Sequence, residues 1–189
     1  VDLVEVLGDA PDFHFVPVGN AGNYTAYHRG YTEELAISAT TRMPRMFGFQ
    51  AAGSAPMVLG HVVKDPDTIA SAIRIGNPAS WELALKAQAD SDGYFGSITD
   101  DKILEAHRIL SAEVGIFVEP ASAISVAGLL ERAEAGEIPK GSTVVLTVTG
   151  HGLKDPQWAL RTADGSEVQP TIVSVDTDEV AGVLGLVRA

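Results

Sequence analysis

Short apolar runs alternate with stretches of helical periodicity along most of this chain, and this alternation constrains the fold more than any other feature. The apolar runs predict buried strands at 13–18, 46–53, 94–98 and 142–149. Apolar residues spaced three and four apart predict helices at 1–7, 21–36, 65–74, 77–89, from Thr99 onward, and 120–136. Strands that alternate with helices assemble into a largely parallel sheet. We therefore predict an α/β fold with a mostly parallel sheet flanked by helices.

The last part of the chain differs in character from the rest. Residues 1–162 carry the alternation, whereas 163–189 are more polar and rich in aspartate. This tail is expected to hold a turn, a short extended piece and a terminal helix from about residue 176. The first eight residues, VDLVEVLG, have helical spacing and end on Gly8, a residue type that favours the position after a helix. Because Val1 falls inside this pattern, we expect either that a leader was removed or that the chain is part of a larger protein.

Composition excludes several classes of function. The chain has 189 residues, no cysteine and a formal net charge of −12 at pH 7. An acidic surface repels nucleic acids and anionic membranes, so we expect neither as a partner. We find no apolar stretch long enough to span a bilayer and no signal-like segment. The absence of cysteine excludes disulfides and agrees with a cytoplasmic location, and the scattered histidines predict no metal site.

The loop GNAGN, residues 19–23, joins the apolar run at 13–18 to a predicted helix. Glycine lets successive backbone N–H groups point at one spot, and the start of a helix adds partial positive charge there. Such a loop can cradle a phosphate without a lysine or an arginine. The motif is neither a Walker loop nor G-x-G-x-x-G. A tight turn from strand to helix, with an asparagine in the left-handed conformation, is the structural alternative.

A second glycine loop, TGHGLKDP at 149–156, follows the last predicted strand. The hydroxyl of Thr149 is placed to hydrogen-bond a ligand, and Gly150 and Gly152 permit close backbone approach. His151 is either a general base or an exposed loop residue. Since ligands bind beyond the carboxyl ends of parallel strands, both glycine loops are expected to border one crevice.

Two further segments carry polar residues toward the same crevice. Glu119 ends a short apolar run just before a predicted helix. Its carboxylate either faces the crevice or satisfies N–H groups at the helix start. In IRIGNPASW, Arg74 and Asn77 either bind an anion or cap a helix.

Five motifs occur in a characteristic order and spacing: VPVGNAGNYTAY, RMPRMFGFQAAGSAP, TIASAIRIGNPASWE, VEPASA and TVTGHGLKDP. Together they resemble the threonine synthase family, which are pyridoxal-phosphate enzymes of the tryptophan-synthase-β (fold type II) group. The resemblance runs from residue 1 to about residue 160 and is weaker beyond. GNAGN is shared widely in the group, whereas GHGLKDP with IRIGNPASWE is more specific to threonine synthase.

The resemblance implies the larger domain of a fold type II enzyme with pyridoxal 5′-phosphate as cofactor. Thr149 would lie by the pyridine nitrogen, where a hydroxyl keeps that nitrogen largely unprotonated, and Glu119 would lie near the ring. Asn20 is also implied as a ligand of the substrate's phosphate. The cofactor phosphate would be held by the backbone N–H groups of Gly19, Asn20, Ala21, Gly22 and Asn23.

The implied reaction is a lyase step of threonine biosynthesis, in which O-phospho-L-homoserine and water give L-threonine and phosphate. The resemblance also implies a homodimer. The family places its Schiff-base lysine in a Ser-Phe-Lys-Asp type motif, which this chain lacks. Together with the start inside a helical pattern, this departure leads us to expect that the chain is the C-terminal part of a longer enzyme and is inactive alone. The lysines that it does contain are at positions 64, 86, 102, 140 and 154.

Two other functions stay open on the sequence. One is a serine or threonine dehydratase of the same fold, which would share the glycine loop but would not be expected to carry GHGLKDP. The other is a non-catalytic module that binds a phosphorylated metabolite through GNAGN. The products of the reaction, threonine and phosphate or a 2-oxo acid and ammonia, distinguish the two enzymes.

Overall fold

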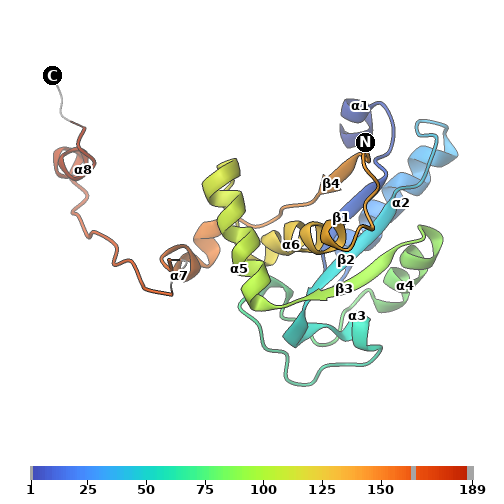
Figure 1. Cartoon of the computed structure of the whole chain (residues 1–189), viewed down its shortest axis with the longest axis horizontal. Helices are drawn as coiled ribbons and strands as arrows, with labels where there is room; N and C mark the ends of the chain where they lie inside the picture. Colours follow the sequence, from blue (N-terminus) through green and yellow to red (C-terminus); the bar gives the residue numbers. More distant parts are fainter. Residues whose placement is uncertain (1, 163–164, 187–189) are drawn as a thin grey trace. The chain divides into compact units, whose positions relative to one another are not determined.

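The computed structural model describes residues 2–162 and 165–186. It divides into two units, Val1–Asp155 and Pro156–Ala189. The first unit contains the sheet and most of the helices (Figure 1). Within the described residues, no helix combines the length and the apolarity needed to cross a membrane.

Four parallel strands form the sheet, in the order β3-β2-β1-β4. In its register, Phe15 of β1 lies opposite Phe47 of β2 and Leu146 of β4. The mostly parallel sheet predicted from the alternation is confirmed. The strands are β1 (Phe13–Pro17), β2 (Arg45–Ala51), β3 (Tyr94–Ile98) and β4 (Val144–Leu146).

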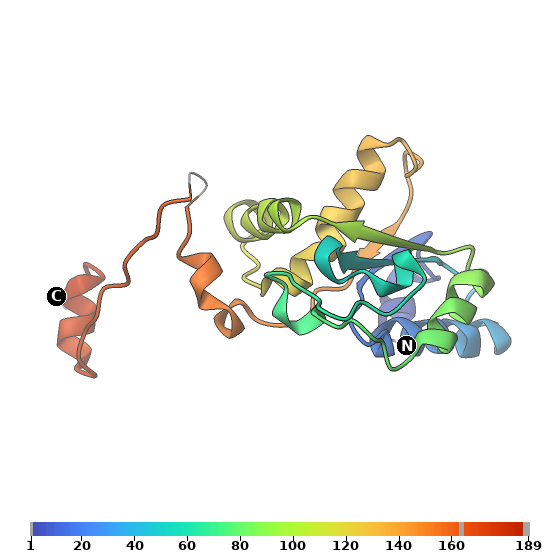
Figure 2. The same ribbon diagram turned by 90° about the horizontal axis from the view of Figure 1, so that it is seen from below.

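Helices cover both faces of the sheet, as the α/β pattern predicts (Figure 2). Alternate residues of β1 enter different cores: Phe15 packs with residues of α5 and α6, whereas Val16 packs with residues of α2 and α4. This two-sided burial explains why the strands read as continuous apolar runs. The helices of the first unit are α1 (Asp2–Leu7), α2 (Gly22–Ala36), α3 (Pro56–Leu59), α4 (Trp81–Asp90), α5 (Asp100–Ile109) and α6 (Pro120–Glu134).

The helix predicted at 65–74 is wrong. Only a 3₁₀ turn, Ser71–Ile73, forms there. The N–H of Asp67 donates to the carbonyl of Gly53 at 3.0 Å, and other tertiary hydrogen bonds hold the segment as a loop. These bonds give the backbone groups of the segment the partners that a helix would otherwise provide. The sequence pattern does not reveal such bonds. The short helix α3 was not predicted.

Two other predicted elements are shorter than expected. The helix predicted from Asn77 begins at Trp81, because the N–H groups of Ala79 and Ser80 donate to Asn20, at 3.2 Å to its side chain and 3.1 Å to its carbonyl. The strand predicted at 142–149 is reduced to β4, which lies at the edge of the sheet. Beyond Thr147 the chain is bound by α6 instead of by a strand.

Among its described residues, the second unit contains two short helices, α7 (Pro156–Ala159) and α8 (Thr177–Val183). The predicted terminal helix is thereby confirmed. Its start is capped by the carboxylate of Asp176, which accepts hydrogen bonds from the N–H groups of Asp178 and Glu179. Parts of the predicted tail, at 163–164 and 187–189, lie outside the described residues.

Candidate functional site

A cavity of about 340 Å³ opens beyond the carboxyl end of β1. All of its lining residues belong to the first unit. It brings together the seven residues that the sequence assigned to cofactor binding: the loop 19–23, Glu119 and Thr149. The complete lining is Pro17, Gly19, Asn20, Ala21, Gly22, Asn23, Ala72, Ile73, Glu119, Ala121, Thr149 and Lys154.

The loop 19–23 turns sharply from strand to helix. Val18 still donates to the carbonyl of Phe49 at 2.8 Å, after which the chain leaves the sheet. Ala21 then adopts the left-handed conformation, with φ 62° and ψ 11°, and α2 begins at the next residue. The left-handed residue predicted for such a turn was an asparagine, and the structure places it at Ala21 instead. This conformation costs an alanine roughly 1 kcal/mol, which the surrounding packing must offset.

The start of α2 leaves backbone donors free. Among the residues described, none accepts a hydrogen bond from the N–H of Gly22, Asn23 or Tyr24. The capping position, Ala21, has no side chain that could serve, and no acidic residue lies in the first turn. By contrast, α4, α5 and α8 each carry an acidic residue there. The positive end of α2 is therefore open to the cavity and suited to an anion.

The segment 71–80 packs directly on the loop. A Cβ on Gly19 would lie 3.2 Å from the Cα of Ile73, so only glycine fits there without displacement. The side-chain oxygen of Asn20 accepts from the N–H of Ala79 at 3.2 Å. Arg74 does not line the cavity: its guanidinium donates to the carbonyl of Thr68, at 3.0 and 2.6 Å. Arg74 thus closes the loop 68–74 and lies outside the candidate site, so its anion-binding interpretation gains no support from the cavity.

The second glycine loop is held by a residue that the sequence analysis did not select. The hydroxyl oxygen of Ser122, in the first turn of α6, accepts from the N–H groups of Thr149 at 2.9 Å and Gly150 at 2.8 Å. It also lies 2.7 Å from the hydroxyl oxygen of Thr149. Ser122 is fully buried. The available signal was a serine among the mostly small and apolar residues of a buried helix face, since a buried hydroxyl needs partners.

Glu119 lies beneath this loop. It is only 2% exposed, and its Oε1 lies 3.7 Å from the Nζ of Lys154. A Cβ on Gly150 would collide with that carboxylate. The close backbone approach predicted for Gly150 is thus an approach to Glu119 of the same chain. His151 does not line the cavity, and its Nδ1 accepts from the N–H of Leu153 at 3.2 Å, which favours the loop-residue interpretation over the general base.

A larger hollow, of about 580 Å³, lies between α1, α2 and β4 around His14. The Nε2 of His14 lies 2.7 Å from the hydroxyl of Thr147, and its Nδ1 lies 3.1 Å from the hydroxyl of Tyr31. Burial lowers the pKa of His14 to about 4, so this ring is neutral at physiological pH. The hollow contains none of the residues predicted to bind a ligand. We therefore take the cavity at the loop 19–23 as the candidate site.

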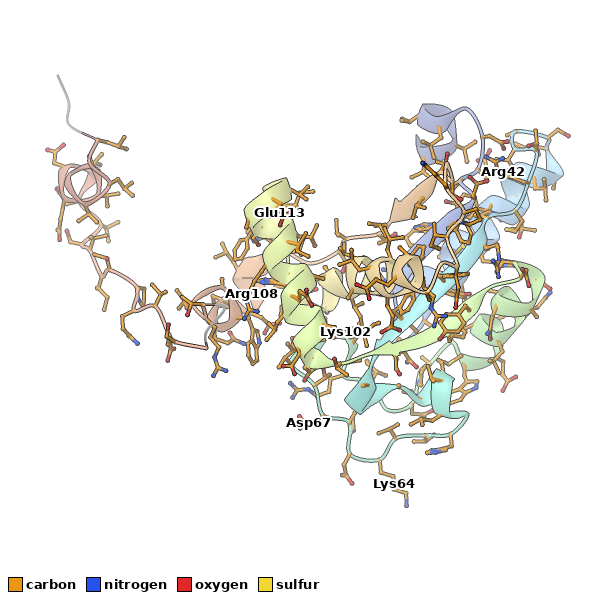
Figure 3. All side chains as sticks on the ribbon, viewed as in Figure 1. Arg42, Lys64, Asp67, Lys102, Arg108 and Glu113 are labelled. Atoms are coloured by element: carbon orange, nitrogen blue, oxygen red, sulfur yellow. The ribbon has the colours of Figure 1, made fainter. Side chains whose placement is uncertain are left out.

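Lysines are sparse around the candidate site. Lys154 is the one lysine that lines it within the part of the chain that the structure describes. Figure 3 shows Lys64 pointing away from the sheet, on the loop after α3. Lys102 on α5 is bound to Glu131, with 2.6 Å between the nitrogen and the oxygen. Among the residues that the structure describes, no group of three or more histidine, cysteine, aspartate or glutamate side chains could hold a metal ion.

Residues 1–150 match the family model described as pyridoxal-phosphate dependent enzyme. The chain belongs to this family. It is 54% identical to a threonine synthase of Mycobacterium leprae (strain TN) over 186 residues, which are 98% of this chain and 51% of that protein. It is 50% identical to a threonine synthase of Synechocystis sp., over 97% of this chain and 47% of that protein. The chain spans about half the length of the curated relatives it matches.

A solved structure supports the fold assignment. The crystal structure of a fungal L-serine ammonia-lyase from Rhizomucor miehei aligns with a TM-score of 0.67 at 19% identity, covering 84% of this chain and 52% of that one. At this identity the likeness concerns the fold alone. The predicted fold, part of a fold type II pyridoxal-phosphate enzyme, is confirmed.

The cavity residues fit the cofactor of this family. Three free N–H groups at the start of α2 suit a phosphate group, and the absence of a side chain at Gly22 leaves open space beside them. The hydroxyl of Thr149 lies on the same lining and suits a ring nitrogen. The polar groups of the lining are neutral except for the ammonium of Lys154 and the carboxylate of Glu119, which lie next to each other. The lining residues are therefore chemically compatible with pyridoxal phosphate.

Proposed function

We propose that the chain is the cofactor-binding part of a threonine synthase, a lyase that converts O-phospho-L-homoserine and water to L-threonine and phosphate. The observation that carries the proposal is the cradle of free N–H groups at Gly22, Asn23 and Tyr24, set among residues of the motifs that resemble threonine synthase. The identity of 54% to the Mycobacterium leprae threonine synthase supports the choice within the family.

In this proposal the backbone of Gly19–Asn23 holds the cofactor phosphate through its N–H groups. The hydroxyl of Thr149 meets the ring nitrogen, and Glu119 lies near the ring. When bound, pyridoxal phosphate supplies a sink for the negative charge that develops on the substrate when a Cα proton leaves. A hydroxyl at the ring nitrogen, in place of a carboxylate, favours the neutral nitrogen and moderates that sink.

Asn20 is the proposed contact to the phosphate of the substrate. Its side-chain oxygen is engaged by the N–H of Ala79, which leaves the two amide N–H donors of Asn20 for an anion. Lys154 adds the one positive charge on the cavity lining. Donors of this kind explain how a chain with a net charge of −12 could bind two phosphate groups, one on the cofactor and one on the substrate.

We also propose that these 189 residues alone do not turn over the substrate. None of their lysines stands in a Ser-Phe-Lys-Asp type motif. Lys154, the lysine on the lining, is paired with Glu119. The covalent attachment of the cofactor would then depend on the region of the relatives that this chain does not match. A homodimer is the proposed assembly of the intact enzyme, and the cytoplasm its proposed location.

A complementation experiment tests this function. The chain is mixed with the half of the Mycobacterium leprae threonine synthase that it does not match, and O-phospho-L-homoserine is added with pyridoxal phosphate. We expect threonine and phosphate in equal amounts from the mixture, and none from either half alone. Turnover by the chain alone would contradict the proposed dependence on a second region.

The products also separate the alternatives. A 2-oxo acid and ammonia would favour a dehydratase, although no motif of this chain is specific to that class. Binding of the phosphorylated substrate by the chain, with no turnover in any mixture, would favour a non-catalytic module. Either result would contradict the proposed threonine synthase.

A further inference from the structure

The hydroxyl of Ser122 occupies the centre of the second glycine loop. It is fully buried, and three groups surround its oxygen within 3 Å: the N–H of Thr149, the N–H of Gly150 and the hydroxyl of Thr149. The carbonyl oxygen of Gly150 lies farther away, at 3.4 Å. Among the described residues, no other side chain accepts hydrogen bonds from the N–H groups of both Thr149 and Gly150.

Counting donors and acceptors fixes the direction of these bonds. A serine hydroxyl has one proton to donate and two lone pairs that accept. The two N–H groups at 2.9 and 2.8 Å take both lone pairs of Ser122. Ser122 must then donate its own proton, and the hydroxyl oxygen of Thr149, at 2.7 Å, is the closest acceptor. The reverse direction would force three hydrogen bonds onto two lone pairs.

This direction decides what Thr149 offers to the cavity. Its oxygen accepts from Ser122, so its own proton points elsewhere, and no residue of the described chain other than Ser122 is hydrogen-bonded to that hydroxyl. The side chain of Thr149 is exposed and lines the cavity. A hydroxyl that accepts one bond donates the next one more strongly.

We propose that Ser122 is a positioning residue that makes the Thr149 hydroxyl a hydrogen-bond donor toward the cavity, and thereby holds the ring nitrogen of the cofactor in its neutral form. The inference rests on the proposed function, because it takes the ring nitrogen to lie at Thr149. A donor pairs with the lone pair of a neutral nitrogen, whereas a protonated nitrogen would need an acceptor. The charged groups on the lining, Glu119 and Lys154, are 3.7 Å apart and largely offset each other.

The chain offers a matched control one helical turn later. Ser125 is also fully buried on α6, and its hydroxyl donates to the carbonyl of Thr147 at 2.9 Å. It therefore holds the same segment of chain, but it does not contact Thr149 or Gly150. Ser125→Ala should loosen the chain at Thr147, just before the loop, and leave the direction of the Thr149 hydroxyl unchanged.

The test uses the 189-residue chain and ¹⁵N-labelled pyridoxine 5′-phosphate, which has the ring and the phosphate but no aldehyde to react with lysines. The pKa of the bound ring nitrogen is read from its ¹⁵N chemical shift across a pH series. We expect Ser122→Ala to raise this pKa by roughly half a unit to one unit, the effect of one hydrogen bond. Ser125→Ala should leave it unchanged, and Ser122→Thr, which keeps the hydroxyl, should keep it low.

A double-mutant cycle separates orientation from simple loosening. Thr149→Val should raise the ring-nitrogen pKa by itself, and Ser122→Ala should then add nothing, because it acts through that hydroxyl. Additive shifts, or faster amide exchange at Thr149 and Gly150 with no change in the pKa, would overturn the inference while leaving the proposed function standing. Failure of the parent chain to bind the probe would overturn the proposed function, and the inference with it.

Discussion

The two glycine loops of this protein look alike in sequence and differ in what their backbones do. In the loop 19–23 and the residue after it, the N–H groups at the start of α2 have no acceptor among the described residues. In the loop 149–152, Ser122 accepts from two N–H groups and the carbonyl of Phe117 accepts from a third, at 3.3 Å. The first loop presents backbone to a ligand, whereas the second uses its backbone internally and presents a side chain.

The glycines follow the same division. A Cβ on Gly22 would meet no atom within 4 Å, which leaves space beside the cavity. A Cβ on Gly150 would collide with Glu119, and one on Gly152 would collide with the ring of Phe117. Gly22 therefore leaves room for a ligand, whereas Gly150 and Gly152, like Gly19, serve internal packing, and substitutions at Gly22 and Gly150 should separate the two uses.

The largest expected effect comes from acid, and it acts through His14, which contacts the segment that leads into the second loop. His14 contacts Thr147, two residues before Thr149, and its pKa is lowered by burial to about 4 from an ordinary value of 6.5. The unfolded chain therefore binds a proton at a higher pH than the folded chain does. The free energy of unfolding should fall as the pH drops from about 6.5 to about 4, by up to about 3 kcal/mol from this residue.

Urea unfolding at a series of pH values measures this loss. His14→Gln should flatten the dependence, because glutamine does not titrate, whereas His61→Gln, at an exposed position, is the matched control. Since His28 and His107 also have pKa values lowered by burial, part of the slope should persist in His14→Gln. An unchanged slope in that variant would contradict the role given to His14.

The next effect concerns the packing of glycine. Gly150→Ala should lower the free energy of unfolding by about 2 kcal/mol, because the buried carboxylate of Glu119 must move. Gly22→Ala is the matched change in the other loop and should leave the stability within about 0.5 kcal/mol of the parent. Equal losses in the two variants, measured by urea unfolding, would remove the distinction between the loops.

A charge placed in the first loop should affect stability and binding in opposite directions. Asn23→Asp puts a carboxylate in the first turn of α2, which should raise the free energy of unfolding by roughly 0.3–1 kcal/mol. The same carboxylate repels a bound anion, so the affinity for pyridoxine 5′-phosphate should fall by about tenfold. Calorimetric titration together with urea unfolding measures both, and an unchanged affinity would argue against an anion at this position.

The smallest expected effect isolates the second loop. Thr149→Val removes one hydroxyl and nearly preserves shape, so the affinity for pyridoxine 5′-phosphate should fall roughly three- to tenfold, the effect of one hydrogen bond. The affinity for inorganic phosphate, which reaches only the first loop, should not change. A parallel loss for inorganic phosphate would mean that the two loops do not bind separate parts of the ligand.

The sequence predicted the members of the site better than their interactions. The loop 19–23, Glu119 and Thr149 could be placed together, because each follows or ends an apolar run and the carboxyl ends of parallel strands share an edge. Ser122 was missed because its role depends on a hydrogen bond across 27 residues of chain. Local patterns contain no information about such partners.

The same limit explains the errors in the fold. The segment 65–74 has a helical pattern, yet the N–H of Asp67 bonds to Gly53 and the guanidinium of Arg74 bonds to Thr68. The run at 142–149 has strong strand propensity, yet its last residues are bound by α6. In both places tertiary hydrogen bonds replaced the regular element that the residues would otherwise favour.

Binding of the cofactor phosphate by the loop 19–23 is the basis of the proposed function. The most direct measurement compares two ligands that differ only in that group, pyridoxine 5′-phosphate and pyridoxine, by calorimetric titration of the 189-residue chain. We expect the phosphorylated ligand to bind at least about tenfold more tightly, and this preference to shrink in Asn23→Asp. Equal affinity for the two ligands would contradict the claim.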